Sequence, residues 1–144
     1  MAFNPTADVD EPAFYTRFGQ SFIDFAAPGG NSDQGFYFDF LLDFCVDSDN
    51  LLCTASPLGV PFGTFDWVWS TDNLSRGGYL PQIGTSMAAP HAAGVAALII
   101  GQNGGNMKPA QVEAKLHQSA DDLGKPGNDD FYGGGRINAF NAVQ

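Results

Sequence analysis

The sequence predicts an α/β fold, because short strand-like runs lead into helical segments along the chain. Residues 22–26 (FIDFA) form a short apolar run that a Pro-Gly-Gly turn brings to an end. Residues 79–83 form a second such run, directly before the strongly helical residues 85–100. With 144 residues, 44% of them hydrophobic and 15% charged, the chain has the size and composition of one globular domain.

The charge balance excludes two classes of partner. Six basic residues stand against sixteen acidic ones, for a net charge of −10, whereas nucleic acids and anionic membranes require clustered Lys and Arg. No apolar run reaches the roughly 18 residues of a membrane span. No signal-peptide pattern is visible after Met1, and the acidic composition suits an exported protein. We therefore expect a secreted or extracytoplasmic protein, present here as a mature or truncated chain.

The first half of the chain is expected to contain little regular structure. Residues 1–21 are polar and are predicted to form a loop that leads into the strand at 22–26. Residues 31–76 are aromatic and acidic, with interspersed Gly, Pro and Ser, and favour a few irregular strands or a hairpin. Cys45 and Cys53 lie in this segment without a neighbouring His, which argues against zinc. A disulfide that closes a local loop is favoured over two free buried thiols.

The helix predicted for residues 85–100 is apolar nearly all round, a pattern typical of helices buried inside a larger fold. Pro90 falls near its first turn, where the backbone N–H groups have no helical partner to lose. A second helix is predicted from Pro109, a favourable first helical residue, to about Ala120. An acidic loop follows, and residues 136–143 are predicted to form a short closing helix.

Ser86 occupies the turn at which the strand ends and the apolar helix begins. A hydroxyl at a helix N-terminus faces unpaired N–H groups and the positive end of the helix dipole, and both stabilise developing negative charge. Gly84 removes a side chain that would crowd an approaching substrate. From position alone, a serine at the start of a helix is more often only a cap.

The run GTSMAAPHAAG at residues 84–94 reverses that interpretation. It resembles the serine motif of the subtilisin-like peptidases (subtilases), G-T-S-M-A-x-P-H-V-A-G, and departs from it only at Ala92, where Val is usual. The resemblance implies that Ser86 is the nucleophile and that its own backbone N–H is one donor of the oxyanion hole. The other motif residues would be structural, and they are Gly84, Thr85, Met87, Pro90 and His91.

Two flanking segments resemble the same family in the same order. Residues 18–29 resemble its "Y-G … D-V-x-A-P-G" segment, and residues 132–143 resemble its closing "Y-G-x-G-x-x-N-A … A-V". The resemblance implies that residues 1–144 are one partial catalytic domain, with 31–75 as an insertion that carries the disulfide loop. The implied fold is the C-terminal half of a three-layer domain: a mainly parallel sheet, with a buried central helix that starts at the nucleophile. Residues 79–83 and parts of the insertion would border the substrate cleft.

The family's Asp, His and oxyanion-hole Asn motifs, which precede the serine in chain order, are absent from this sequence. A serine without a base is a weak nucleophile at neutral pH. His91 lies five residues after Ser86, about 140° around the helix, and points elsewhere. His117 is expected at the surface near the end of the second helix, and is a less favoured candidate for the base.

The acidic residues offer no clear metal site. Asp24 is expected to be structural. Other carboxylates could bind calcium, but no spacing matches a known calcium loop, so solvated loops are favoured. These carboxylates belong to Asp47, Asp49, Asp121, Asp122, Asp129 and Asp130. The sequence therefore predicts no required cofactor.

Three functions fit these observations. The favoured one is the C-terminal part of a subtilase that hydrolyses protein or peptide substrates, with the missing N-terminal half as its complement. The second is a small stand-alone esterase that pairs Ser86 with a different base, since esters need less base assistance than amides. The third is a catalytically inert remnant or binding module. An uncovered apolar helix would favour a homo-oligomer.

Overall fold

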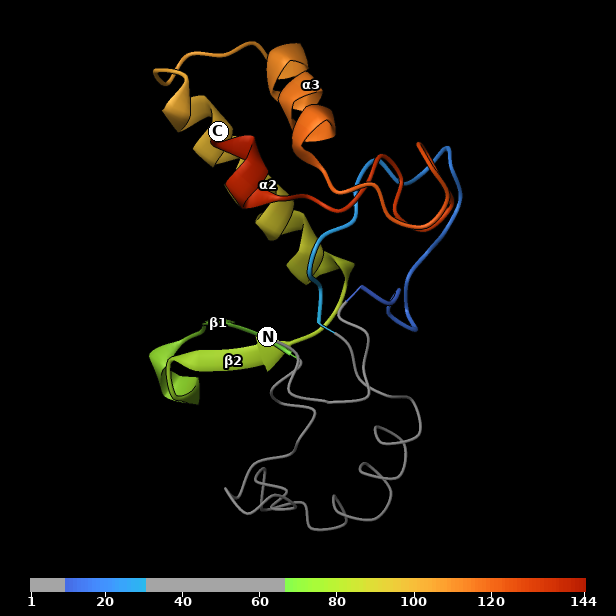
Figure 1. The fold of residues 1–144 in the computed structure, drawn as a ribbon. Coiled ribbons are helices and arrows are strands. Elements are labelled where there is room, and N and C mark those ends of the chain that lie inside the picture. Colours follow the sequence, from blue (N-terminus) through green and yellow to red (C-terminus); the bar gives the residue numbers. More distant parts are fainter. Residues whose placement is uncertain (1–9, 31–66) are drawn as a thin grey trace. The chain divides into compact units, whose positions relative to one another are not determined.

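The computed structural model describes residues 10–30 and 67–144 (Figure 1). The predicted disulfide between Cys45 and Cys53 lies outside the described residues, as do Asp47 and Asp49. Within the described ranges, no helix has both the length and the apolar character that a membrane span requires.

The chain divides into two compact units by its internal contacts. Unit 1 consists of Met1–Tyr15 and Gly29–Gly84, and unit 2 consists of Thr16–Pro28 and Thr85–Gln144. A division by contacts does not define domains. The prediction of one partial catalytic domain over residues 1–144 therefore stays a prediction.

Unit 1 contains a β-hairpin. Strand β1 (Val68–Thr71) pairs with β2 (Tyr79–Gln82) in antiparallel register, and the 3₁₀ turn η2 (Leu74–Arg76) lies between them. The side chain of Asn73 caps this turn by accepting a hydrogen bond from the Ser75 N–H at 3.0 Å. The strand predicted at residues 79–83 is confirmed, and the insertion contributes its partner.

Unit 2 is built on three helices, α2 (Thr85–Gln102), α3 (Pro109–Ser119) and α4 (Ala139–Ala142), and both α3 and α4 pack against α2 (Figure 1). The first two helices begin at the predicted residues, and Pro109 occupies the first turn of α3. The predicted closing helix is shorter than expected, because Arg136 forms backbone bridges to Ala26 and Asp121 before α4 begins.

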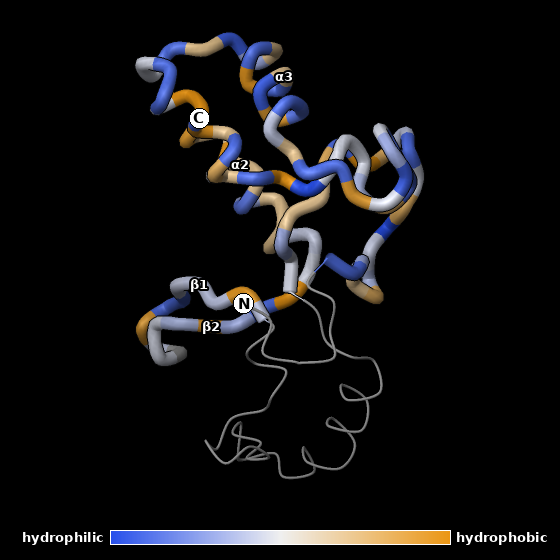
Figure 2. Tube along the Cα trace, in the orientation of Figure 1, coloured by the Kyte–Doolittle hydropathy of each residue, from blue (hydrophilic) through white to orange (hydrophobic). Residues whose placement is uncertain are grey.

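The core of unit 2 lies along one face of α2. Its buried side chains are Val95, Ile99, Ile137 and Ala142. Although α2 is apolar over most of its length (Figure 2), only Val95 and Ile99 are buried on it, and Leu98 is 52% exposed. The helix is therefore not enclosed as predicted, because α3, α4 and the segment around Phe25 cover only one of its sides.

A mainly parallel sheet is not found among the described residues, whose two named strands are antiparallel. The strand predicted at 22–26 is reduced to two bridging residues. Phe25 bridges Gly133 in antiparallel fashion, and Ala26 bridges Arg136 in parallel fashion. The α/β character of the described chain thus comes from one hairpin, isolated bridges and three helices.

Among the glycines of unit 2, Gly133 lies closest to the backbone of another segment. Its φ is +58°, and an added Cβ would lie 2.3 Å from the Ile23 carbonyl oxygen and 2.7 Å from that of Asp24. Both contacts are with backbone atoms, which cannot rotate away. Glycine is therefore required both for the conformation and for the space.

We predict that Gly133→Ala lowers the free energy of unfolding by about 2 kcal/mol or more, since it adds a steric collision to the cost of a left-handed residue. Gly104→Ala is the matched control, because Gly104 also has a positive φ of +80° but has open space around it. It should cost only about 1 kcal/mol. Urea unfolding followed by circular dichroism measures both variants, and equal losses would contradict the collision.

Candidate active site

Ser86 is the second residue of α2, and its side chain is exposed. Gly84 precedes the helix with a φ of +144°, a value that side-chain-bearing residues rarely adopt. The first-turn N–H groups of a helix have no intrahelical acceptor, so they are available to a negatively charged group near Ser86. The first turn of α2 contains no acidic side chain that would compete for them.

Thr85, Met87, Pro90 and His91 lie within the first two turns of α2. Pro90 is its sixth residue and lies just beyond the first turn. It has no N–H to donate to the carbonyl of Ser86, four residues earlier. Proline is thus tolerated at the cost of one helical hydrogen bond, and not because that bond was already missing.

His91 does not act on Ser86 in this structure. Its Nδ1 lies 2.8 Å from the carbonyl oxygen of Met87, one turn earlier in the same helix, and its side chain is exposed. The expectation that this imidazole points away from Ser86 agrees with this geometry.

His117, the less favoured candidate for the base, is exposed near the end of α3, as expected, and its ring packs against Phe25. Its ring centroid lies 4.4 Å from that of Phe25, at an interplanar angle of 45°. Its Nδ1 would lie 2.5 Å from a Cβ added to Gly134, so the ring lies directly against that glycine. Across residues 10–30 and 67–144, neither histidine forms a hydrogen bond with the Ser86 hydroxyl.

A surface hollow of about 320 Å³ adjoins His117 and Asp24 in unit 2. Gln20 and Asn128 line it and hydrogen-bond mainly to each other, with Asn128 Nδ2 3.2 Å from the Gln20 carbonyl oxygen. The backbone carbonyl of Asp24 accepts the Gly134 N–H at 2.8 Å, and a structural role for its side chain stays a prediction. The hollow contains polar groups but no serine.

The acidic loop after α3 is organised by its carboxylates. Asp129 is buried, and it accepts backbone hydrogen bonds from Tyr132 at 2.7 Å, Phe131 at 2.9 Å and Lys125 at 3.1 Å. These bonds, that of Tyr132 above all, hold the pKa of Asp129 below its usual value. Asp122 likewise accepts from the Gly127 N–H at 3.0 Å.

Asp121 joins the loop to the C-terminal segment. It forms an ion pair with Arg136 at 2.7 Å and accepts a hydrogen bond from Asn138 at 3.0 Å. The bond from Arg136, followed by that from Asn138, lowers the pKa of Asp121. The expectation of solvated acidic loops is wrong for the buried Asp129, whereas Asp122 is exposed and Asp121 is half-buried beside Arg136. In the part of the chain that the structure describes, no group of three or more His, Cys, Asp or Glu residues could hold a metal ion.

One residue near the motif was missed by the sequence analysis. Tyr15 lies in the stretch that was predicted to be loop, and its hydroxyl donates to the carbonyl oxygen of Gly29 at 2.8 Å. The same carbonyl accepts the Gly84 N–H at 2.9 Å, directly before α2. No local pattern could indicate this contact, because it joins residues 14 and 55 positions apart.

Comparison with known proteins gives a consistent result. The sequence matches the family model of the subtilase family over residues 4–135. An extracellular serine protease of Serratia marcescens is 44% identical over 66 residues, which are 46% of this chain and 6% of that protein. Thermitase of Thermoactinomyces vulgaris is 37% identical over 78 residues, which are 54% of this chain and 25% of that protein.

A solved structure agrees. The epidermin leader peptide processing serine protease of Staphylococcus aureus superposes with a TM-score of 0.58 at 28% identity, over 88% of this chain and 26% of that one. The chain thus spans about a quarter or less of the length of the relatives it matches.

We predict that, in a fusion that supplies the family's missing N-terminal half, His117→Gln leaves the fluorophosphonate labelling of Ser86 unchanged, because His117 contacts Phe25 and not Ser86. The same change should lower the free energy of unfolding by about 0.5–1.5 kcal/mol through loss of the ring contact. Gln118→Ala, at the next exposed position of α3, is the control and should change neither quantity by much. A tenfold loss of labelling in His117→Gln alone would identify His117 as the base.

We also predict that Asp129→Asn destabilises the chain at pH 7 but not near pH 2. Because the folded-state pKa of Asp129 is lowered, its stabilisation is present above the ordinary carboxyl pKa and is lost as the pH falls through the folded-state value. Urea midpoints between pH 7 and pH 2 should therefore converge for wild type and variant. Glu113→Gln, an exposed change on α3, should run parallel to wild type, and a constant gap for Asp129→Asn would contradict the linkage.

Proposed function

This chain belongs to the subtilase family, and we propose that it carries the nucleophile of a serine peptidase that hydrolyses peptide bonds through an acyl-enzyme on Ser86. The observation that supports this most directly is the position of Ser86, which is exposed in the first turn of α2, two residues after the left-handed Gly84. The family match includes this segment.

The proposed chemistry follows from that position. The Ser86 Oγ attacks the scissile carbonyl carbon, and its proton passes to a general base. The oxyanion of the tetrahedral intermediate accepts a hydrogen bond from the Ser86 backbone N–H, in the field of the α2 N-terminus. Collapse of the intermediate expels the amine and leaves an acyl ester on Ser86, which water then hydrolyses. One oxyanion donor is worth on the order of 3 kcal/mol of barrier.

We propose that the base, its orienting carboxylate and the oxyanion-hole Asn come from outside residues 1–144. The sequence contains none of those family motifs. Among the described residues, His91 bonds to its own helix and His117 packs on Phe25. These contacts also argue against the stand-alone esterase, which needs an imidazole within hydrogen-bonding distance of Ser86.

The substrate that we propose is a protein or peptide, as expected for a serine peptidase, and we propose no cofactor as a requirement. The sequence leaves calcium binding at the acidic segments as an alternative. We also propose export from the cytoplasm, which agrees with the net charge of −10 and with the name of the extracellular relative from Serratia marcescens.

The test is to fuse the chain behind the N-terminal part of thermitase that precedes the matched segment, and to compare the fusion with its Ser86→Ala variant. We expect fluorophosphonate labelling and turnover of a peptide amide in the fusion. The variant should lose at least a thousandfold in kcat, since subtilisin without its serine loses more than that.

The unfused chain provides the second arm. Under the proposed function, the folded chain of 144 residues labels no faster than its Ser86→Ala variant and turns over neither amide nor p-nitrophenyl ester. Ser86-dependent ester turnover by the chain alone would support the esterase instead. A folded fusion without any Ser86-dependent reaction would support the inert remnant.

A further inference from the structure

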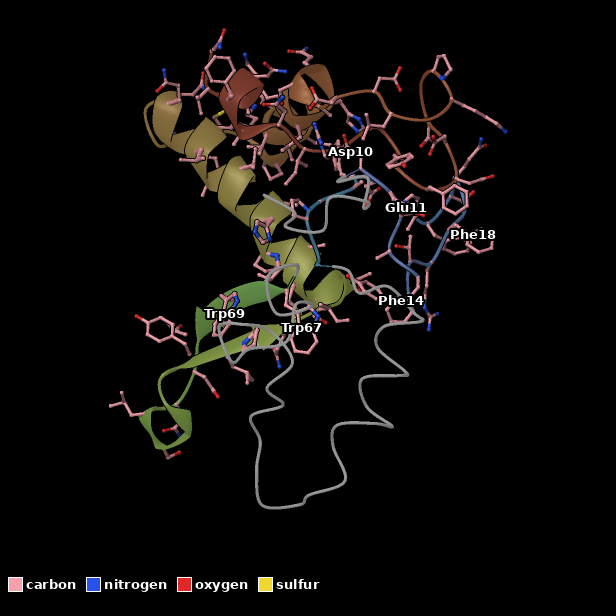
Figure 3. All side chains as sticks on the ribbon, turned by 60° about the horizontal axis from the view of Figure 1, so that its bottom comes forward. Asp10, Glu11, Phe14, Phe18, Trp67 and Trp69 are labelled. Atoms are coloured by element: carbon pink, nitrogen blue, oxygen red, sulfur yellow. The ribbon has the colours of Figure 1, made fainter. Side chains whose placement is uncertain are left out.

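The Tyr15 hydroxyl lies at the point where unit 1 leads into α2. It donates to the Gly29 carbonyl oxygen at 2.8 Å and also contacts that of Gly30. The ring is half-buried and packs edge-on against Phe14, with centroids 5.2 Å apart. Figure 3 labels Phe14 on this segment. Tyr15 is thus held both through its ring and through its hydroxyl.

The Gly29 carbonyl is a shared acceptor. Besides the Tyr15 hydroxyl, it accepts the Gly84 N–H at 2.9 Å. A carbonyl oxygen has two lone pairs, so these two donors complete its capacity. Tyr15, Gly29 and Gly84 all belong to unit 1, and each is an end of a segment of that unit. Through the Gly29 carbonyl, Gly84, the residue before α2, is therefore linked by hydrogen bonds to Gly29 and Tyr15.

Gly84, which is held by this hydrogen bond, directly precedes the first residue of α2. Gly84 has the left-handed φ of +144°, and only Thr85 separates it from Ser86. A rotation of the Gly84 peptide plane would be passed to Ser86 through two covalently linked residues. Small errors in the position of a nucleophile are costly, because attack requires a near-attack distance and alignment.

The protonation state of Tyr15 suits a donor. Burial raises the pKa of the Tyr15 hydroxyl above its usual value, and a hydrogen bond from Gly84 acts in the opposite direction to a smaller extent. The hydroxyl therefore keeps its proton throughout the neutral range. Phenylalanine at this position would keep the ring packing and remove only the donor.

We propose that Tyr15 is a positioning residue for the nucleophile: its hydroxyl fixes the Gly29 carbonyl that holds Gly84, and thereby the turn from which Ser86 enters α2. The effect on catalysis rests on the proposed function, whereas the tie itself does not. The role is distinct from substrate binding, because the hydroxyl is directed at backbone carbonyls of its own unit.

The test compares Tyr15→Phe with Tyr79→Phe, which removes a hydroxyl from an exposed tyrosine of the same unit. In the chain of 144 residues, amide hydrogen exchange at Gly84 should be about fivefold to tenfold faster in Tyr15→Phe and unchanged in Tyr79→Phe. In the fused enzyme, Tyr15→Phe should lower kcat by about the same factor and leave KM unchanged, since acylation geometry and not binding is affected.

The outcomes separate this inference from the proposed function. Unchanged exchange at Gly84 overturns the tie, whatever the activity. Faster exchange at Gly84 with unchanged kcat in Tyr15→Phe overturns the positioning role and leaves Tyr15 a structural residue. A rise in KM without a change in kcat has the same meaning. A fusion that lacks Ser86-dependent turnover, but whose Gly84 exchange depends on Tyr15, disproves the proposed function and supports the tie.

Discussion

The backbone pairing between residues 24–26 and 134–137 is the constraint on which unit 2 depends. The Gly134 N–H donates to Asp24 at 2.8 Å, the Ala26 N–H donates to Gly135 at 3.0 Å, and the Ile137 N–H donates to Ala26 at 2.9 Å. These bonds join segments more than one hundred residues apart and place Phe25 beside the core along α2. Without residues 24–27, only α3 and α4 would pack against α2 in unit 2.

Such close pairing imposes demands on the residues that carry it. Residues 133–135 have no room for a side chain, because a Cβ on any of these glycines would lie 2.3–2.6 Å from a backbone or imidazole atom. The loop before them must also reach the correct place, and Asp129 ensures this by accepting three backbone N–H groups. Asp121 then fixes Arg136 and Asn138 on the far side of the pairing. An acidic loop that looks solvated in the sequence is therefore a framework of charge-assisted hydrogen bonds.

Local signals explain what the sequence predicted well. Pro109 marks the start of α3, and the serine motif marks the start of α2, because both depend on residues next to each other in the chain. The limits of the prediction are equally physical. Residues 22–26 have the composition of a strand, but only Phe25 and Ala26 of this segment form β-bridges, and their partners lie near the C-terminus. The contact of Tyr15 with Gly29 is a property of the folded chain that no short stretch of sequence contains.

The same reasoning explains why no imidazole accompanies Ser86 among the described residues. A helix N-terminus can orient a hydroxyl and stabilise an oxyanion using only local backbone, so one short segment can carry both functions. A general base must instead approach from outside that helix, because neighbouring helical positions such as His91 point around the axis or back to their own turn. The geometry of the serine motif thus depends on neighbouring residues in the sequence, whereas the position of a base depends on the tertiary structure. Under the proposed function, this difference is the physical reason that Ser86 would need a base from outside these 144 residues.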